Sequence, residues 1–248
     1  MTMTAAGAPS SVTIQGRVLT FPVEVRQARW WTAQYLVPAA AAERLVAPTG
    51  LELARPFPGR AVVSLAVVRY EDGDLGRYHE VGVAFLVRLH DAKPASPREA
   101  ALEVARGTVG AYIHHLPVNQ EFTLEAGRTI WGYPKFMADI RIVEKPGWVK
   151  ARLSHEGRHI LTLTMHEGGP LTLPSIAVPT YTYLDDVLRV TRWTMRGTNR
   201  GRPGGSRLVL GDHPIGDELR SLGLPKRGLL TSSVRNFRAR FEPATRVP

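Results

Sequence analysis

The sequence predicts a β-rich α+β domain in which a long antiparallel sheet curls around a site. Three observations support this prediction. Apolar segments of strand length recur along most of the 248 residues, helical patterns are few and short, and 23 glycines and 19 prolines supply frequent turns. Runs of strands joined by turns, with helices between them, are typical of this fold class.

The composition is that of a globular protein, with 44% hydrophobic and 22% charged residues. The length allows one domain or two fused half-domains. No run of 18 apolar residues occurs, and residues 1–11 lack the charged and apolar parts of a signal peptide. The absence of cysteine excludes disulfides and thiol chemistry. We expect a flexible segment over residues 1–11, a single domain over residues 12–248, and a cytoplasmic location with no membrane contact.

The net charge of +10 is concentrated near the C-terminus, where residues 187–248 hold 13 Lys and Arg against 4 Asp and Glu. A nucleic-acid-binding tail is one interpretation. A basic surface, or arginines at subunit contacts, is the interpretation we favour. The arginines are spread through apolar stretches and are not clustered with stacking aromatics, so a nucleic-acid partner is not expected. A positive field would also attract a small anionic substrate.

The N-terminal half predicts mainly strands. We expect a strand or hairpin over residues 12–25, a strand over 26–37, a short helix over 38–46 that begins with proline, and a long hairpin. The hairpin joins strands over 59–70 and 78–87 through a turn cluster at 71–76.

The C-terminal half continues this pattern with a polar connection and one helical turn over 94–106, a strand over 108–117 and hairpins over 141–165. Residues 170–190 could cover a pocket, 197–205 form an Arg/Gly loop without a phosphate-binding motif, 212–223 form a capped helix and 229–241 a final strand. His114 and His115 should point to opposite faces of their strand, so that one of them faces the pocket. A turn separates His155 from His159, which we interpret as surface histidines and not as a zinc site.

The most informative stretch is residues 119–140, which reads as a short helix that ends and delivers one lysine. Asn119 is a plausible N-cap. Gly132 stands where a helix ends in the left-handed conformation, and Pro134 prevents further helix. Lys135 follows at the junction with a strand over 136–143, between aromatic neighbours: Trp131, Tyr133 and Phe136.

A lysine in such apolar surroundings has two interpretations. Its stem could lie on the aromatic rings while the ammonium stays in water. Alternatively, the amine is desolvated, which favours the neutral form that attacks a carbonyl carbon and forms an imine.

The motif Glu125-Ala-Gly-Arg128, followed by Trp131-Gly-Tyr-Pro-Lys135, resembles the acetoacetate decarboxylase superfamily. The resemblance implies that Lys135 forms a Schiff base with the substrate ketone. Glu80, which opens a strand after a glycine-containing turn, matches an acidic residue of the family that reaches the active site. The spacing from Arg29 to Pro48 matches the segment that binds the substrate carboxylate, although Arg26 competes with Arg29 for this role.

The same resemblance implies a cone-like double β-barrel with short peripheral helices, a homo-oligomer, and a small oxo acid as substrate. We expect no cofactor and no metal. The aromatic neighbours of Lys135 would help to bind the substrate: Trp131, Tyr133 and Phe136.

Two departures from the decarboxylase pattern leave the reaction open. Decarboxylases carry a further glutamate where this chain has Ser64 or Leu65, and tend to carry a second lysine where it has Phe136. With that cation absent, a dry pocket would have to favour the neutral amine. Decarboxylation of a β-oxo acid such as acetoacetate is therefore the first expectation. A pyruvate aldolase–dehydratase is the alternative, and a non-catalytic basic binding protein is an alternative of another class.

Overall fold

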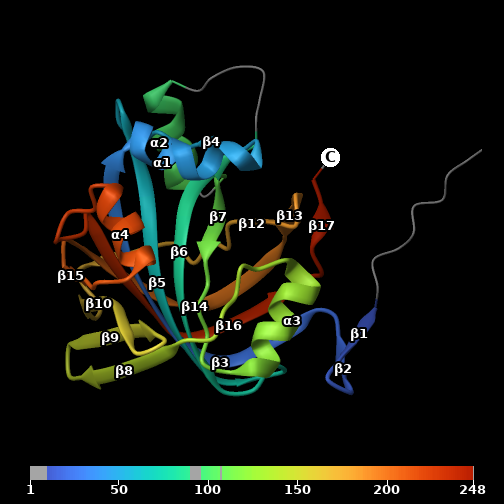
Figure 1. The fold of residues 1–248 in the computed structure, drawn as a ribbon. Helices are drawn as coiled ribbons and strands as arrows, with labels where there is room; N and C mark the ends of the chain where they lie inside the picture. The colour runs from blue at the N-terminus through green and yellow to red at the C-terminus, as the bar shows by residue number, and fades with distance from the viewer. Residues whose placement is uncertain (1–9, 90–95, 107, 248) are drawn as a thin grey trace, which may run out of the picture.

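A computed structural model describes residues 10–89, 96–106 and 108–247, and it confirms the β-rich α+β fold (Figure 1). The helical elements are α1 Ala39–Val46, η1 Ala47–Thr49, α2 Pro97–Arg106, α3 Glu121–Trp131 and α4 Pro214–Ser221. The strands are β1 Ser11–Ile14, β2 Arg17–Thr20, β3 Val23–Pro38, β4 Glu52–Leu53, β5 Arg60–Gly73, β6 Tyr78–Arg88, β7 Gly110–His115, β8 Asp139–Lys145, β9 Trp148–His155, β10 Arg158–His166, β11 Leu171–Thr172, β12 Thr180–Leu184, β13 Val187–Thr191, β14 Trp193–Pro203, β15 Ser206–Leu210, β16 Leu230–Phe241 and β17 Thr245–Arg246.

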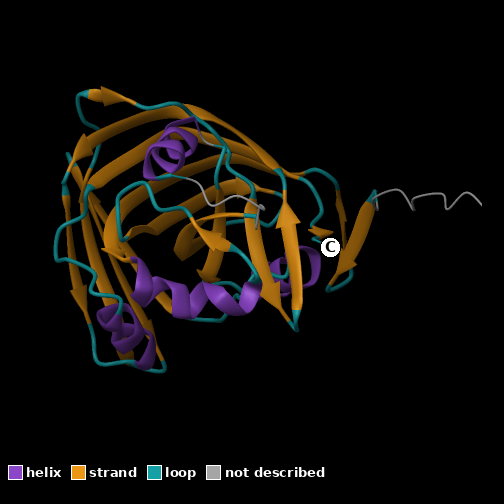
Figure 2. Ribbon diagram, turned by 90° about the horizontal axis from the view of Figure 1, so that it is seen from above, coloured by secondary structure: helices purple, strands orange, loops and turns teal. Residues whose placement is uncertain are grey.

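One 11-stranded sheet forms most of the molecule. Its order is β11-β14-β16-β3-β5-β6-β7-β12-β13-β17, and β4 pairs with β6. The pairing is antiparallel except between β7 and β12, which are parallel and thus depart from the predicted all-antiparallel arrangement. Figure 2 shows the sheet curling round on itself. Its end strands β11 and β17 do not pair with each other in the described residues, so the double barrel is not confirmed.

A second sheet, of order β15-β10-β9-β8, packs against the large sheet and encloses the main core. Side chains that share this core come from both sheets and from the helices α1 and α4, and they are almost completely buried: Trp31, Leu65, Phe85, Leu153, Leu161, Leu163 and Leu219. Side chains alternate between the two faces of a strand, so every second residue of β3, β5 and β6 points into this core. The residues between them point to the opposite face of the sheet.

The opposite face is covered by α3 and by the hairpin of β1 and β2, which lie beside each other in Figure 1. Their apolar side chains form a second cluster with residues of β5 and β6: Ile14, Leu19, Tyr78, Leu116, Phe122, Trp131 and Tyr133. We call this face the α3 face and the other the core face. The segment that carries Lys135 lies where the two meet.

Most predicted elements are confirmed, and the differences have local causes. Residues 197–205 were predicted as a loop, but most of them belong to β14, because their glycines sit at a bulge and at close backbone approaches. The helical turn expected over 94–106 is a helix, α2, while residues 94–95 lie outside the described part. The strand predicted to start at residue 136 starts at Asp139. Of the predicted flexible segment, residues 1–9 also lie outside the described part, and β1 begins at Ser11.

No helix in the described residues is long and apolar enough to cross a membrane.

Candidate active site

The hairpin of β5 and β6 presents a carboxylate and two phenols on the α3 face. Glu80 lies opposite Val68 of β5, and Tyr78 lies opposite Tyr70. Since alternate residues of a strand point to the same face, Glu80 and both tyrosines share one face. The two tyrosine rings stack with their centroids 4.2 Å apart.

Helix α3 ends as the sequence predicts and delivers Lys135. Gly132 caps the helix in the left-handed conformation with φ 64°, and its N–H bonds to the carbonyl oxygen of Arg128. At the other end the N-cap is Gln120 and not Asn119: the Gln120 side chain accepts a hydrogen bond from the backbone N–H of Thr123. The Asn119 side chain is engaged elsewhere, since its Oδ1 accepts a hydrogen bond from the backbone N–H of His79 at 2.7 Å.

Backbone bonds to Val118 fix the chain on either side of Lys135. The Val118 N–H donates to the carbonyl oxygen of Phe136 at 3.0 Å, and the Ala138 N–H donates to that of Val118 at 2.9 Å. Val118 also forms an isolated bridge to Glu80 of β6. The lysine segment thus lies beside Val118, which in turn bridges to Glu80 of β6.

The Lys135 side chain is buried, with 4% of the residue exposed, and its amine meets two polar partners. Lys135 Nζ lies 2.9 Å from Glu80 Oε2 and donates to Thr123 Oγ1 at 3.0 Å. The amine also lies 5.2 Å from the centroid of the Tyr78 ring. Glu80 is 8% exposed, so both members of the ion pair are removed from water. A buried ammonium is tolerated because it is paired and hydrogen-bonded.

Gly127 makes room for the lysine stem where it crosses α3. A Cβ atom at this position would lie 2.5 Å from Lys135 Cδ and 2.6 Å from its Cε. Gly127 and Thr123 are four residues apart and therefore lie on the same side of the helix. The glycine of the Glu125-Ala-Gly-Arg128 motif is therefore required because the Lys135 side chain passes over it.

Two tyrosines complete the polar group around Glu80. The Tyr70 hydroxyl donates to Glu80 Oε1 at 3.1 Å. Burial, followed by the negative charge of Glu80, raises the pKa of Tyr70 and of Tyr78 well above the ordinary value. Both phenols therefore stay protonated at neutral pH and remain available as hydrogen-bond donors.

Trp131 and Tyr133, predicted to bind substrate, lie on the α3 face in the same apolar cluster as Tyr78. Trp131 Nε1 donates to the backbone carbonyl of Glu242, and the Tyr133 hydroxyl is 2.9 Å from Thr180 Oγ1. Burial raises the pKa of Tyr133, against the opposing effect of the Thr180 hydrogen bond. Their contact with a substrate stays a prediction.

The structure does not bring Arg29 or Phe136 to the amine of Lys135. Trp30 of β3 lies opposite Val68 of β5, which lies opposite Glu80 of β6, so all three point to the α3 face. Arg29 is adjacent to Trp30 in β3 and therefore points to the core face. Phe136 packs against the main core, whereas Lys135 pairs with Glu80 on the α3 face. Neighbouring residues of an extended segment point to opposite faces, which explains both results.

Arg29 belongs to a charged cluster beside a cavity of about 560 Å³. Its guanidinium bonds to Glu144 and to Glu167 and lies over the ring of Trp31. Lys135 and Glu80 are not among the residues that line this cavity, which include Gln27, Arg29, Glu71, Glu144, Glu167 and Arg235. The role of Arg29 as carboxylate ligand stays a prediction, and its two carboxylate partners already satisfy its charge.

Sequence reasoning missed Thr123, Tyr70 and Tyr78. A signal for Thr123 was present, since it lies one helical turn before Gly127. Tyr78 precedes Glu80 by two residues and so shares its face. Tyr70 could not be found without the register between β5 and β6.

Comparison with known proteins assigns the family. The family model described as Acetoacetate decarboxylase (ADC) matches residues 8–242. The chain belongs to the acetoacetate decarboxylase family. No curated protein sequence matches it significantly.

Solved structures share the fold of this acetoacetate decarboxylase family member. The acetoacetate decarboxylase of Legionella pneumophila subsp. pneumophila str. Philadelphia 1 has a TM-score of 0.71 at 16% identity and covers 100% of this chain and 92% of its own. Another acetoacetate decarboxylase has a TM-score of 0.70 at 20% identity, and the match covers 91% of this chain and 89% of that one. The enduracididine biosynthesis enzyme MppR complexed with pyruvate has a TM-score of 0.64 at 18% identity, covering 92% and 91%.

The two positions that depart from the decarboxylase pattern have other roles in this family member. Ser64 accepts a hydrogen bond from Gln34 Nε2, and Leu65 is fully buried in the main core. Phe136 contacts the rings of His115 and His155 on the core face. In the described residues the carboxylate paired with the Lys135 amine is that of Glu80.

Replacing Gly127 by alanine should displace the lysine. Alanine is the better helix former by about 1 kcal/mol, so helix propensity alone would favour the variant. The new methyl group would nevertheless overlap the Lys135 stem and push the ammonium away from Glu80, so we expect imine formation to fall at least tenfold and the free energy of unfolding to fall as well. Borohydride trapping and urea unfolding measure the two effects. Thr129→Ala, at an exposed position of the same helix, is the control. Trapping of Gly127→Ala at the wild-type rate would refute the close passage.

Removing the ammonium should leave the Glu80 carboxylate buried without its ionic partner. We expect Lys135→Met to lower the free energy of unfolding by about 3–5 kcal/mol. The double variant Glu80→Gln/Lys135→Met should recover part of that loss, because no unpaired charge is left inside. Urea unfolding of both variants tests this, with Lys150→Met at an exposed position as control. A double variant no more stable than the single one would contradict the coupling.

Arg29→Gln should separate the two roles open to that residue. The ion pairs with Glu144 and Glu167 predict lower stability, with unchanged trapping of pyruvate relative to the neutral ketone acetone. The measurements are urea unfolding and paired trapping rates with the two carbonyl compounds. A loss confined to pyruvate would instead assign Arg29 to the substrate carboxylate, at a cost of several kcal/mol for a buried charged partner.

Proposed function

We propose that this protein is an enzyme that forms a Schiff base between Lys135 and the ketone carbon of a small oxo acid. The observation that carries the proposal is the buried amine of Lys135, held 2.9 Å from Glu80 Oε2 and 3.0 Å from Thr123 Oγ1. A primary amine fixed in a dry site, with a carboxylate in direct contact, has the nucleophile and the base that imine formation requires.

Glu80 is the group that moves protons at the amine. Attack requires neutral amine, so the ammonium proton passes to Glu80 Oε2, and the ion pair becomes a neutral pair. The amine then adds to the ketone carbon, and the resulting carbinolamine loses water to give the imine. Glu80 returns the proton to the departing hydroxyl, and water carries away the oxygen atom. Tyr70 stabilises the carboxylate form through its bond to Oε1, while Thr123 orients the amine.

Decarboxylation of a β-oxo acid is the first reaction we propose. The protonated imine accepts the electron pair of the breaking C–C bond, and the carboxylate departs as carbon dioxide. The product is an enamine attached to Lys135, which takes a proton at carbon and is then hydrolysed to release the ketone. Family membership supports this route.

Aldol condensation followed by dehydration is the second reaction, and two observations favour it. This chain lacks both the additional glutamate and the second lysine of the decarboxylase pattern. A structural neighbour, MppR, is described in complex with the condensation product of pyruvate and imidazole 4-carboxaldehyde. In this route the pyruvate imine loses a methyl proton, the enamine attacks an aldehyde, and the new hydroxyl leaves as water.

A homo-oligomer that uses the basic surface for subunit contacts is part of the proposal. Arginines on β14 and β16 support it: Arg196 lies directly opposite Arg238, and both side chains are exposed. Two like charges directly opposite each other are costly on a free surface and favour an acidic partner surface. A non-catalytic basic binding protein would show salt-dependent nucleic-acid binding and no imine.

Trapping with borohydride tests the imine. We expect reduction in the presence of acetoacetate, pyruvate, or pyruvate with an aromatic aldehyde to add mass at Lys135, located by peptide mapping. Lys135→Ala should show no adduct, and Lys150→Ala, which removes an exposed lysine, should react like the wild type. An adduct that persists in Lys135→Ala, or none with any oxo acid, would overturn the proposal.

The reaction itself is distinguished by the products. Release of carbon dioxide from acetoacetate supports decarboxylation. Formation of an unsaturated oxo acid from pyruvate and aldehyde supports condensation and dehydration, and the conjugated product is followed by its ultraviolet absorption. Trapping without either product would retain the imine and exclude both reactions.

A further inference from the structure

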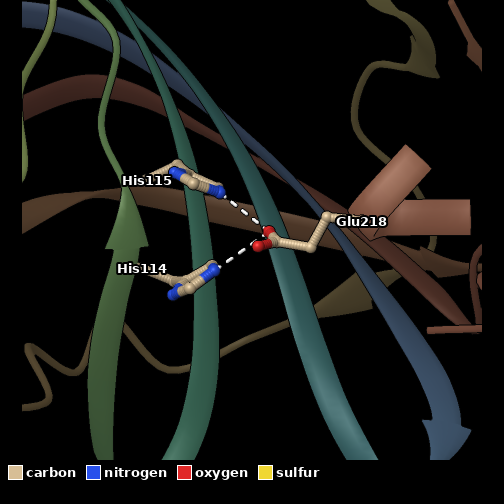
Figure 3. Close-up of side chains that lie close together, drawn as sticks. All are labelled: His114, His115 and Glu218. Carbon is tan, nitrogen blue, oxygen red and sulfur yellow. Dashed lines mark hydrogen bonds and ion pairs between the residues drawn. The ribbon is translucent and has the colours of Figure 1, made fainter. Parts of the chain in front are cut away.

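Two histidines and one glutamate converge on the core face, away from the Lys135–Glu80 pair. His114 Nε2 lies 3.0 Å and His115 Nε2 lies 2.8 Å from the same oxygen, Oε1 of Glu218 (Figure 3). Both histidines belong to β7, whereas Glu218 belongs to α4, about 100 residues later in the chain. Within the described residues, His114, His115 and Glu218 are the group of three metal-ligating side chains whose ligand atoms lie close enough together to hold a metal ion.

A bulge in β7 produces this convergence. His114 and His115 are consecutive and should point to opposite faces of a regular strand, as the sequence predicted. In the structure Val83 of β6 pairs with His115 and Ala84 with Ile113, so His114 is the extra residue between the two pairs. A bulge redirects side chains, and here it turns both imidazoles toward Glu218. The prediction of opposite faces is therefore wrong.

The spacing of the three ligand atoms suits zinc. Tetrahedral Zn²⁺ with bonds of about 2.0–2.1 Å places its ligand atoms roughly 3.3 Å apart. The two nitrogen–oxygen distances are 3.0 and 2.8 Å, and all three ligand atoms lie within 4.8 Å of one another. Small outward shifts of the imidazoles from the Glu218 oxygen would bring the two nitrogen–oxygen distances to the zinc value. Two imidazoles and one carboxylate are a common zinc set that leaves a fourth position for water or another ligand.

The surroundings combine an apolar lining with a route from solvent. The His114 ring contacts those of Phe85 and Tyr112, and the His115 ring faces Phe136. The side chains are not sealed, since His114 is 14%, His115 20% and Glu218 28% exposed. An apolar shell strengthens the attraction between a cation and its carboxylate ligand, while partial exposure allows the ion to enter.

No other charged side chain in the described part of the chain forms an ion pair with the Glu218 carboxylate. Its hydrogen bonds to the two imidazoles require an N–H on each ring that a metal ion would replace. We propose that His114, His115 and Glu218 bind one divalent transition-metal ion of the zinc class. This binding site is additional to the imine chemistry and departs from our expectation of no metal.

The bound ion would connect β7 to α4 at a point three residues before Val118. Val118 holds Phe136 and Ala138 through backbone bonds and bridges to Glu80. The metal would therefore stiffen the chain that supports the lysine segment without touching the lysine. Its direct consequence is greater thermal stability, because a ligand that binds the folded state alone shifts the unfolding equilibrium.

Calorimetric titration with Zn²⁺ tests the site, using chelator-treated protein without a histidine tag. We expect one ion per chain and a rise in the melting temperature. Glu218→Gln and His115→Asn should each weaken zinc binding by more than tenfold, since even loss of an outer partner of a metal ligand costs about 10–100-fold. His166→Asn removes an exposed histidine outside the cluster and should bind zinc like the wild type.

Cobalt supplies an independent readout on the wild-type protein, in case a variant fails to fold. Co²⁺ bound by two imidazoles and a carboxylate in a four- or five-coordinate site gives visible absorption bands much stronger than those of octahedral Co²⁺. Such bands at one equivalent, displaced by Zn²⁺, would support the site. Absence of one-to-one binding, octahedral spectra only, or equal affinity in folded Glu218→Gln would overturn the proposal.

Discussion

The buried ion pair between Lys135 and Glu80 is the constraint on which the rest of the candidate site depends. Two charges removed from water are stable only where their geometry and their remaining hydrogen bonds are satisfied. The structure meets both conditions, because the Tyr70 hydroxyl donates a hydrogen bond to the second carboxylate oxygen of Glu80 and Thr123 accepts one from the ammonium. The absence of a side chain at Gly127 allows the stem to cross α3.

This arrangement changes the physical explanation for the reactivity we propose for Lys135. From the sequence, dry surroundings alone were expected to favour neutral amine, with Phe136 as part of the dry wall. The side chain of Phe136 instead packs in the main core, and a carboxylate lies in contact with the amine. A neighbouring carboxylate favours the ammonium, so burial and pairing oppose each other. In the proposed function this contact would join the roles of nucleophile and base, because the carboxylate lies 2.9 Å from the amine and no distant base is needed.

The sequence contained the local features of the site but not its long-range contacts. The end of α3 at Gly132, the delivery of Lys135 and the strand that carries Glu80 all follow from patterns within about 20 residues. Arg29 and Glu80 point to opposite faces of the large sheet because side chains alternate along a strand. Predicting this would have required the register between β3, β5 and β6, which the sequence does not show. The bulge at His114 has no local signal, because it depends on how β7 pairs with β6.

The same alternation divides the molecule into two chemical faces. On the α3 face the Lys135 amine and the phenols surround one carboxylate, whereas on the core face Phe136 adjoins the imidazoles of His115 and His155. Because Lys135 and Phe136 are consecutive, a change in the packing of one face moves the backbone of the other. In the reactions we propose, decarboxylation requires one proton at carbon, while dehydration of an aldol also requires a proton for the leaving hydroxyl. In the proposed reactions Glu80 is the candidate donor for both protons, because the raised pKa of Tyr70 and of Tyr78 makes their phenols weak acids that give hydrogen bonds and not protons.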